Sequence, residues 1–85
     1  MTIESRRLLI VEDDSVLRER LNAYFSVRNE VCTASTISDG IALAKSTSLD
    51  GIILDLILPD GDGMTLFDAV DDLPPVVILS DISSE

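Results

Sequence analysis

Two groups of acidic residues follow short apolar runs in this chain, and their spacing could support chemistry on a cation or a phosphoryl group. The first group contains Glu12, Asp13 and Asp14, and the second contains Asp55, Asp60 and Asp62. Carboxylates ~4 Å apart repel by roughly 4 kcal/mol per pair at an effective dielectric constant near 20. Acids brought together in this way must be protonated or bind a cation, and oxygen ligands favour Mg²⁺. Because the chain has no histidine, His-based catalysis and His metal ligands are excluded.

The glycines of the second group raise the alternative of a calcium-binding loop. An EF-hand loop has glycine at its sixth position, an acid at its first and a glutamate at its twelfth. With Gly63 in the sixth position, the first would be Leu58 and the twelfth Ala69. Neither side chain can bind a cation, so the sequence excludes an EF-hand.

A second alternative is the nucleophile motif of haloacid dehalogenase-type phosphatases, in which Asp60 would be the nucleophile and Asp62 the acid. That motif leaves its strand directly, whereas Asp60 follows Pro59, well beyond the apolar run that ends near Asp55. We therefore interpret residues 60–63 as turn residues that lead into a helix.

Short apolar runs alternate along the chain with segments that favour helices. The runs occupy residues 8–11, 31–34, 51–54 and 76–79, and the helix-prone segments occupy residues 15–29, 38–46 and 64–70. Continuous runs of four apolar residues are typical of parallel strands that are covered on both faces. The alternation predicts an α/β fold in which parallel strands are joined by right-handed helical crossovers.

The first helix-prone segment carries an apolar stripe. Positions i, i+4, i+7 and i+8 of this segment are Leu17, Leu21, Tyr24 and Phe25. This spacing predicts one apolar stripe of an amphipathic helix. Asp14 or Ser15 is a suitable N-cap for it.

The ends of the predicted strands bring the acids of the two groups together. The first strand ends in Glu12 and Asp13, the third in Asp55 and the fourth in Ser80. In open parallel sheets, ligands bind beyond the carboxyl ends of the strands. If the first and third strands are neighbours, Glu12, Asp13 and Asp55 converge on one site.

Length and composition narrow the classes of function. The 85 residues form at most one small domain, and a net charge of −10 argues against direct contact with nucleic acid or an anionic membrane. No apolar run approaches the ~20 residues of a membrane span. Cys32 is the single cysteine, so a reducing compartment and a cytoplasmic location are expected.

Three motifs together resemble the receiver domain of bacterial two-component response regulators: "LLIVEDD", "LDLILPDGDGM" and "VVILSD". The resemblance covers essentially the whole chain, in the right order. It implies a doubly wound, flavodoxin-like parallel sheet with strand order 2-1-3-4. It also implies that residues 1–85 form a single receiver domain that is incomplete at its C-terminus, with the fifth strand and the last helices missing.

The resemblance implies a role for each matching residue. Asp55 would be the phosphoacceptor for a sensor histidine kinase, and Asp13 would bind Mg²⁺ together with Asp55, with Glu12 helping. The backbone carbonyl of Ile57 would complete the protein's metal ligands, and Ser80 would be the switch hydroxyl. The domain would then be a signalling switch and not an enzyme with its own substrate.

Two departures from the family pattern favour an alternative, a phosphorylation-independent pseudo-receiver that acts as an interaction scaffold. The family's fifth strand ends in a lysine, whereas the one lysine here, Lys45, lies in the second helix-prone segment. Asp81 follows the hydroxyl position, where the family usually has a small residue. A strand at residues 76–79 without a further neighbour would be an exposed apolar edge, so we expect a fragment of a longer protein, or a homodimer through that edge.

Overall fold

The computed structural model describes residues 6–79 of the chain. Its elements are β1 (Arg6–Val11), α1 (Ser15–Phe25), β2 (Asn29–Ala34), α2 (Ile37–Ser46), β3 (Gly51–Asp55), β4 (Ile57–Leu58), β5 (Gly61–Asp62), α3 (Thr65–Ala69) and β6 (Val76–Leu79). Each predicted apolar run and helix-prone segment corresponds to a strand or helix, but the first helix is shorter than the predicted 15–29, because it ends at Phe25 and Asn29 begins β2. The two-residue strands β4 and β5 were not expected.

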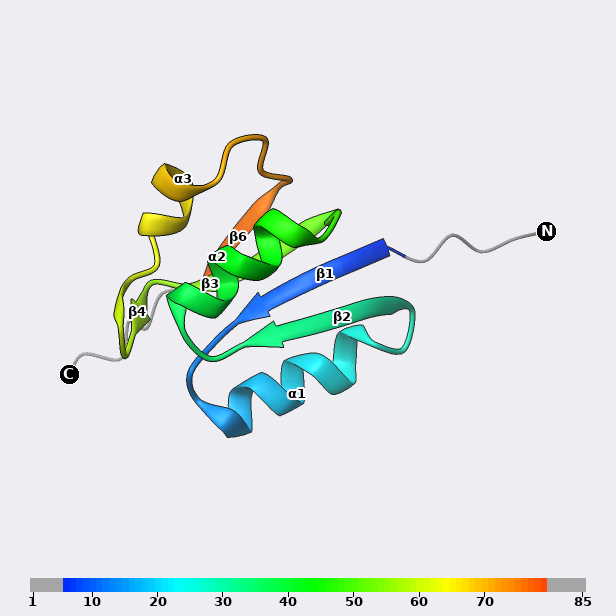
Figure 1. Ribbon diagram of the computed structural model, residues 1–85. Helices are drawn as coiled ribbons and strands as arrows, with labels where there is room; N and C mark the ends of the chain where they lie inside the picture. The colour runs from blue at the N-terminus through cyan, green and yellow to red at the C-terminus, as the bar shows by residue number, and fades with distance from the viewer. Residues whose placement is uncertain (1–5, 80–85) are drawn as a thin grey trace.

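The longer strands form one parallel sheet in the order β2-β1-β3-β6 (Figure 1). Leu9 of β1 lies between Cys32 of β2 and Ile52 of β3, and Ile53 pairs with Val77 of β6. Because β6 is the fourth long strand along the chain, the predicted order 2-1-3-4 and the flavodoxin-like α/β fold are confirmed. Within residues 6–79, β6 pairs with β3 alone and is therefore an edge strand.

The main core lies between the sheet and the helices α2 and α3. It is built from Leu9, Val11, Ala34, Ile37, Ile52, Leu54, Leu58 and Leu66. Fully burying a side chain of this size stabilises the fold by roughly 1.5–3 kcal/mol. Gly40 lets α2 approach β1, since a Cβ at that position would lie 3.0 Å from a methyl group of Val11.

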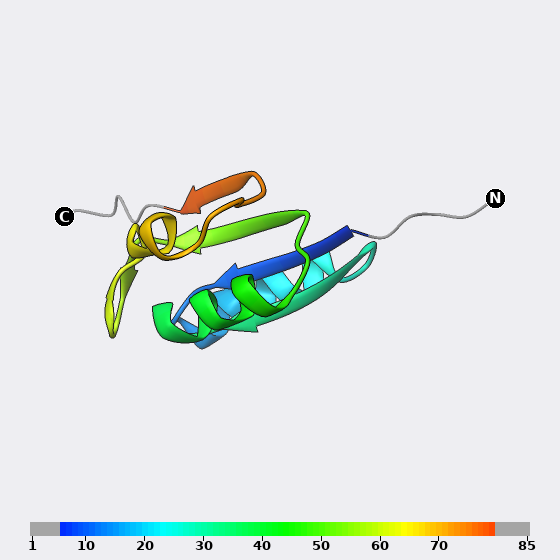
Figure 2. The same cartoon turned by 45° about the horizontal axis from the view of Figure 1, so that its top comes forward.

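Helix α1 lies on the opposite side of β1 and β2 from α2 (Figure 2). The predicted helix and its N-cap are confirmed, because Asp14 accepts backbone N–H bonds from Val16 and Leu17. The stripe is only partly covered: Leu21 and Phe25 are partly buried, whereas Leu17 is 39% exposed, Tyr24 is 75% exposed, and no residue of α1 is fully buried. The helix contacts β1 and β2, so stripe residues that point beyond those strands meet solvent.

Coverage of the strands also differs from the prediction at the two edges of the sheet. The central strands are covered on both faces, since residues 9–11 of β1 and 52–54 of β3 are all buried. On edge strand β6, Val77 is 60% exposed and Ile78 is 43% exposed. An apolar run of four therefore identified each strand, but only the inner strands are enclosed.

The segment between β3 and α3 folds as a small antiparallel hairpin, in which Ile57 pairs with Asp62 and Leu58 with Gly61. Residues 60–63 are thus only partly the turn that was predicted, because Gly61 and Asp62 form β5. Gly61 has a φ of 151°, a conformation that glycine adopts readily. The following helix α3 is short, and no helix within residues 6–79 is long and apolar enough to cross a membrane.

Candidate functional site

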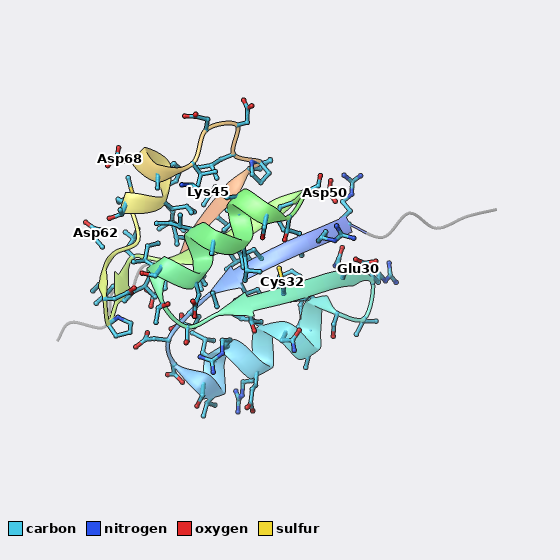
Figure 3. The ribbon with its side chains drawn as sticks, viewed as in Figure 1. Glu30, Cys32, Lys45, Asp50, Asp62 and Asp68 are labelled. Atoms are coloured by element: carbon cyan, nitrogen blue, oxygen red, sulfur yellow. The ribbon has the colours of Figure 1, made fainter. Side chains whose placement is uncertain are left out.

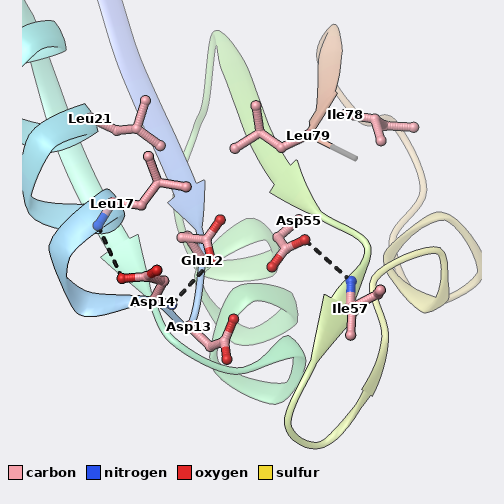
Figure 4. A pocket seen from close by; sticks show the side chains of 9 residues that line it. All are labelled: Glu12, Asp13, Asp14, Leu17, Leu21, Asp55, Ile57, Ile78 and Leu79. Atoms are coloured by element: carbon pink, nitrogen blue, oxygen red, sulfur yellow. Dashed lines mark hydrogen bonds between the residues drawn. The ribbon is translucent and has the colours of Figure 1, made fainter. Parts of the chain in front are cut away.

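Three acids meet at the carboxyl ends of β1 and β3. These strands are neighbours, with Val11 beside Leu54, so the residues that follow them lie at the same edge of the sheet. Carboxylate oxygens of Glu12, Asp13 and Asp55 lie within 4.8 Å of one another. Figure 4 shows these side chains facing one another, and we refer to the three residues as the acid cluster. The predicted convergence of the two acidic groups is therefore present.

Glu12 is the most enclosed member of the acid cluster, at 4% exposure. Its backbone N–H donates to the carbonyl of Ala34 at 2.9 Å, and its carboxylate accepts from the N–H of Asp14 at 3.0 Å. Burial raises the pKa of Glu12 above its usual range, and the nearby charge of Asp55 raises this pKa further. Both effects favour the neutral acid until a positive charge arrives.

The oxygens of the acid cluster are close enough together to hold one metal ion. Mg²⁺ binds oxygen at about 2.0–2.1 Å, so two ligand oxygens on opposite sides of the ion are about 4.2 Å apart. The oxygens of the acid cluster lie within 4.8 Å of one another, which is close to that separation. Asp13 is exposed, which leaves room for the waters that Mg²⁺ usually retains.

The loop after β3 holds Asp55 against the β4–β5 hairpin. The N–H of Ile57 donates to the carboxylate of Asp55 at 3.3 Å, and the N–H of Gly63 donates to the carbonyl of Leu56 at 2.7 Å. A Cβ on residue 63 would overlap the carbonyl oxygen of Asp55, so this close approach requires glycine. Ile57, predicted as a metal ligand through its carbonyl, lines the same pocket as the acid cluster.

Asp60 and Asp62, the acids that the phosphatase alternative would use, bind helix starts instead of joining the acid cluster. The carboxylate of Asp60 accepts from the N–H groups of Ile37 and Ser38 at 2.8 and 3.0 Å. These bonds lower the pKa of Asp60 below its usual range. Asp62 accepts from the N–H of Met64 at 2.9 Å, just before α3. Sequence reasoning missed this role of Asp60, for which no local pattern exists.

A cation from α1 also touches the backbone of the acid cluster. The guanidinium of Arg18 donates to the carbonyl of Glu12 at 2.9 Å and to that of Asp13 at 3.3 Å. It thereby ties the loop between β1 and α1 to the helix through two backbone carbonyls. This contact was not predicted.

Apolar side chains form the walls of the pocket above the acid cluster. Leu17 and Leu21 of α1 line one side, and Ile78 and Leu79 of β6 line the other (Figure 4). The pocket thus opens between α1 and the edge strand, on the face that α2 does not cover.

Two residues named in the sequence analysis, Ser80 and Asp81, lie outside the described residues. Lys45 is placed in the last turn of α2 and is exposed (Figure 3). Because the acid cluster lies at the end of the sheet where α2 begins, Lys45 lies at the far end of α2 from it.

Comparison with known protein families gives one family for nearly the whole chain. The model of the response regulator receiver domain matches residues 8–85. The transcriptional activator protein PfeR of Pseudomonas aeruginosa is 36% identical over an alignment that covers all of this chain and 29% of PfeR. The transcriptional regulatory protein PmrA of Pectobacterium parmentieri is 44% identical over 71% of this chain and 28% of PmrA. The chain therefore spans less than a third of the length of these two relatives.

Solved structures agree with this family. The non-phosphorylated HemR receiver domain of Leptospira biflexa superposes with a TM-score of 0.80 at 34% identity, over 95% of this chain and 68% of that one. The N-terminal domain of an uncharacterized protein of Wolinella succinogenes gives a TM-score of 0.85 at 32% identity, over 94% of this chain and 68% of that one.

Proposed function

This chain belongs to the response regulator receiver domain family, and from that premise we propose that it accepts a phosphoryl group on Asp55. The observation that carries the proposal is the convergence of Glu12, Asp13 and Asp55 at one edge of the sheet. Asp55 is the member that stands at the end of a central strand, partly buried and beside an open pocket. A carboxylate in this position can act as a nucleophile that a donor molecule can reach.

The proposed donor is a phosphohistidine on a sensor histidine kinase. A carboxylate oxygen of Asp55 attacks the phosphorus atom, and an O–P bond forms while the N–P bond breaks. The electron pair of the N–P bond returns to the imidazole, which takes up a proton from water. The product is an acyl phosphate on Asp55. The transition state of such a transfer is loose, so positioning and charge neutralisation matter more than covalent assistance.

The acid cluster is proposed to hold Mg²⁺, with Asp13 and Asp55 as direct ligands and Glu12 helping. The carbonyl of Ile57 is the remaining proposed protein ligand. When bound, the ion neutralises negative charge on the incoming phosphoryl group. The chain's own contributions are the N–H of Ile57, which orients the carboxylate of Asp55, and the guanidinium of Arg18, which fixes the loop that carries Glu12 and Asp13.

The consequence of phosphorylation is proposed to be a switch and not the turnover of a substrate. Ser80 is the proposed hydroxyl that responds to the phosphoryl group. PfeR and PmrA are named as transcriptional proteins, which supports a transcriptional output. With a net charge of −10, this segment itself is not proposed to contact nucleic acid.

The test is the formation of a covalent adduct on the full-length gene product. The protein is incubated with Mg²⁺ and acetyl phosphate, and intact-mass spectrometry measures the addition of one phosphoryl group. We expect the adduct in the wild type and in D68N, a control at an exposed acid of α3 (Figure 3), and its loss in D55N. Absence of any Asp55-dependent adduct, with beryllofluoride also failing to bind, would exclude the proposal.

A pseudo-receiver is the second candidate, and the position of Lys45 favours it. The only lysine of the sequence, Lys45, lies in the last turn of α2, so within residues 6–79 no lysine stands beside Asp55 to pair with a phosphoryl group. This candidate predicts a folded protein that binds its kinase equally well with and without D55N and forms no adduct. Phosphorylation at Asp55 in the wild type would exclude it.

A further inference from the structure

The backbone N–H groups in the first turn of α2 donate hydrogen bonds to acceptors from two different parts of the chain. An α-helix begins with N–H groups that have no partner within the helix. The hydroxyl of Thr36, the N-cap, accepts from the N–H of Asp39 at 3.1 Å. The N–H groups of Ile37 and Ser38 are accepted by the carboxylate of Asp60, which is 22 or more residues away in the sequence.

Asp60 joins α2 to the β4–β5 hairpin. It lies in the turn between the two strands, after Leu58, which is 7% exposed and belongs to the main core. On the other side of the turn, Gly61 lies against Ile37, since a Cβ on the glycine would be 3.8 Å from the nearest methyl group of Ile37. The two hydrogen bonds, together with Leu58 and Ile37 in the same core, hold the hairpin against the start of α2.

The same hairpin carries the backbone that faces the acid cluster. Ile57 begins β4, and its N–H donates to the carboxylate of Asp55. Gly63 follows β5 and donates to the carbonyl of Leu56. The position of the hairpin therefore sets where the Ile57 backbone lies and how the carboxylate of Asp55 is turned.

We propose that Asp60 is a positioning residue for this site: by binding the N-terminus of α2, it fixes the β4–β5 hairpin and, through Ile57, the geometry in which Asp55 binds a divalent cation. This inference rests on the proposed function of the acid cluster. It also means that α2 and the acid cluster are coupled, because a change at Asp55 that moves the hairpin must strain or release the bonds from Ile37 and Ser38.

A comparison with Thr36 separates positioning from simple helix stabilisation. Both residues satisfy N–H groups in the first turn of α2, but Thr36 belongs to the helix start itself and does not contact the hairpin through its hydroxyl bond. T36A and D60A therefore both weaken the start of α2, while only D60A also releases the hairpin. Loss of residues that hold ligands in place typically weakens metal binding by 10–100-fold.

The experiment measures the Mg²⁺ dissociation constant of the full-length protein by titration for the wild type, T36A, D60A, D60N and the exposed control D68A. We expect D60A to raise the constant roughly tenfold, and T36A and D68A to leave it unchanged. D60N, which keeps one of the two acceptor positions, should fall between the wild type and D60A. If D60A does not fold, the Mg²⁺ affinity of D60N alone still tests the proposal.

A second measurement follows the amide exchange of Ile37 and Ser38 as Mg²⁺ and beryllofluoride are added. In the wild type and in T36A, we expect the exchange rates of these amides to change when Mg²⁺ and beryllofluoride bind. In D60A, we expect binding to leave these rates unchanged. Wild-type Mg²⁺ affinity in D60A and D60N, or an equal loss in T36A and D60A, would overturn the inference while leaving the proposed function intact. If the wild type binds neither Mg²⁺ nor beryllofluoride, the proposed function fails and this inference fails with it.

Discussion

Two sets of carboxylates lie near the same edge of the molecule, and they have opposite effects on its stability. The acid cluster is Glu12, Asp13 and Asp55, and the capping acids are Asp14, Asp60 and Asp62. Members of the acid cluster face one another, whereas each capping acid accepts backbone N–H bonds at the start of a helix or, for Asp62, just before it. A negative charge is repelled in the first setting and stabilised in the second. Whether an acid costs or contributes stability therefore depends on what faces it.

The largest expected effect comes from D55N. Removing the proposed nucleophile should abolish the phosphoryl adduct and weaken Mg²⁺ binding at least tenfold, because a ligand and a charge are lost together. Intact-mass spectrometry and metal titration measure the two effects. The comparison between the two sets would break if D62N, which alters a capping acid, abolished the adduct equally well.

The second prediction concerns the difference in free energy of unfolding between E12Q and the wild type, which should depend on whether Mg²⁺ is present. Without Mg²⁺, E12Q should raise the free energy of unfolding by about 1 kcal/mol, because it removes one buried charge from a repelling cluster. With Mg²⁺ at about 100 times its dissociation constant, the wild type should gain roughly 2.7 kcal/mol and E12Q should gain less. Urea unfolding with and without Mg²⁺ measures both. An E12Q protein that is less stable than the wild type without Mg²⁺ would contradict the repulsion.

The third prediction concerns a capping acid alone. Asp14 accepts from Val16 and Leu17 at 2.9 and 3.2 Å, so D14A should lower the free energy of unfolding by about 1 kcal/mol. The loss should be the same with and without Mg²⁺, and D14S, which keeps an N-cap oxygen, should recover most of it. A D14A loss that appears only when Mg²⁺ is present would place Asp14 with the acid cluster instead.

The smallest expected effect is on the pH dependence of stability, because the pKa values of Asp60 and Glu12 are shifted in opposite directions. The pKa of Asp60 is lowered from its ordinary value of 3.8 by the N–H bond from Ile37. Its ionised form therefore stabilises the fold above that value, and this contribution disappears as pH falls through the lowered pKa. The deficit of D60N relative to the wild type should be complete well above pH 3.8 and should shrink as the pH falls below 3.8 through the lowered pKa.

Glu12 should behave in the opposite way, because burial raises its pKa from 4.5. Its stabilising form is the neutral acid, whose contribution is complete below pH 4.5 and is lost as pH rises through the raised pKa. Without Mg²⁺, the advantage of E12Q over the wild type should therefore grow as the pH rises. Urea unfolding at a series of pH values measures the stability of both variants. If the stabilities of E12Q and D60N relative to the wild type changed with pH in the same direction, the contrast between the acid cluster and the capping acids would be contradicted.

The acid cluster could be predicted from sequence because its assembly needs only one fact of topology. Once β1 and β3 are neighbouring parallel strands, residues 12 and 55 must end at the same edge. The N-cap role of Asp14 was also predictable, since it depends on the residues that follow it directly. The bonds of Asp60 were not, because its partners Ile37 and Ser38 are more than twenty residues away and no periodicity links them.

The apolar stripe of α1 shows a different limit. Its spacing correctly predicts a helix, but the extent to which Leu17 and Tyr24 are buried depends on what else packs on that face of the sheet. Within residues 6–79, that neighbourhood holds α1 and the exposed side of β6. Periodicity reports which residues share a face and says nothing of the elements that cover it.

The register of the edge strand has a consequence for how this molecule could be regulated by assembly. Asp55 pairs with Leu79 at the end of β6, and adjacent strands are about 4.8 Å apart. A parallel strand that docked beside β6 would thus end roughly two strand spacings, or about 10 Å, from Asp55. A long side chain on the docked strand could reach Asp55, so the docking of a strand could change the reactivity of the aspartate.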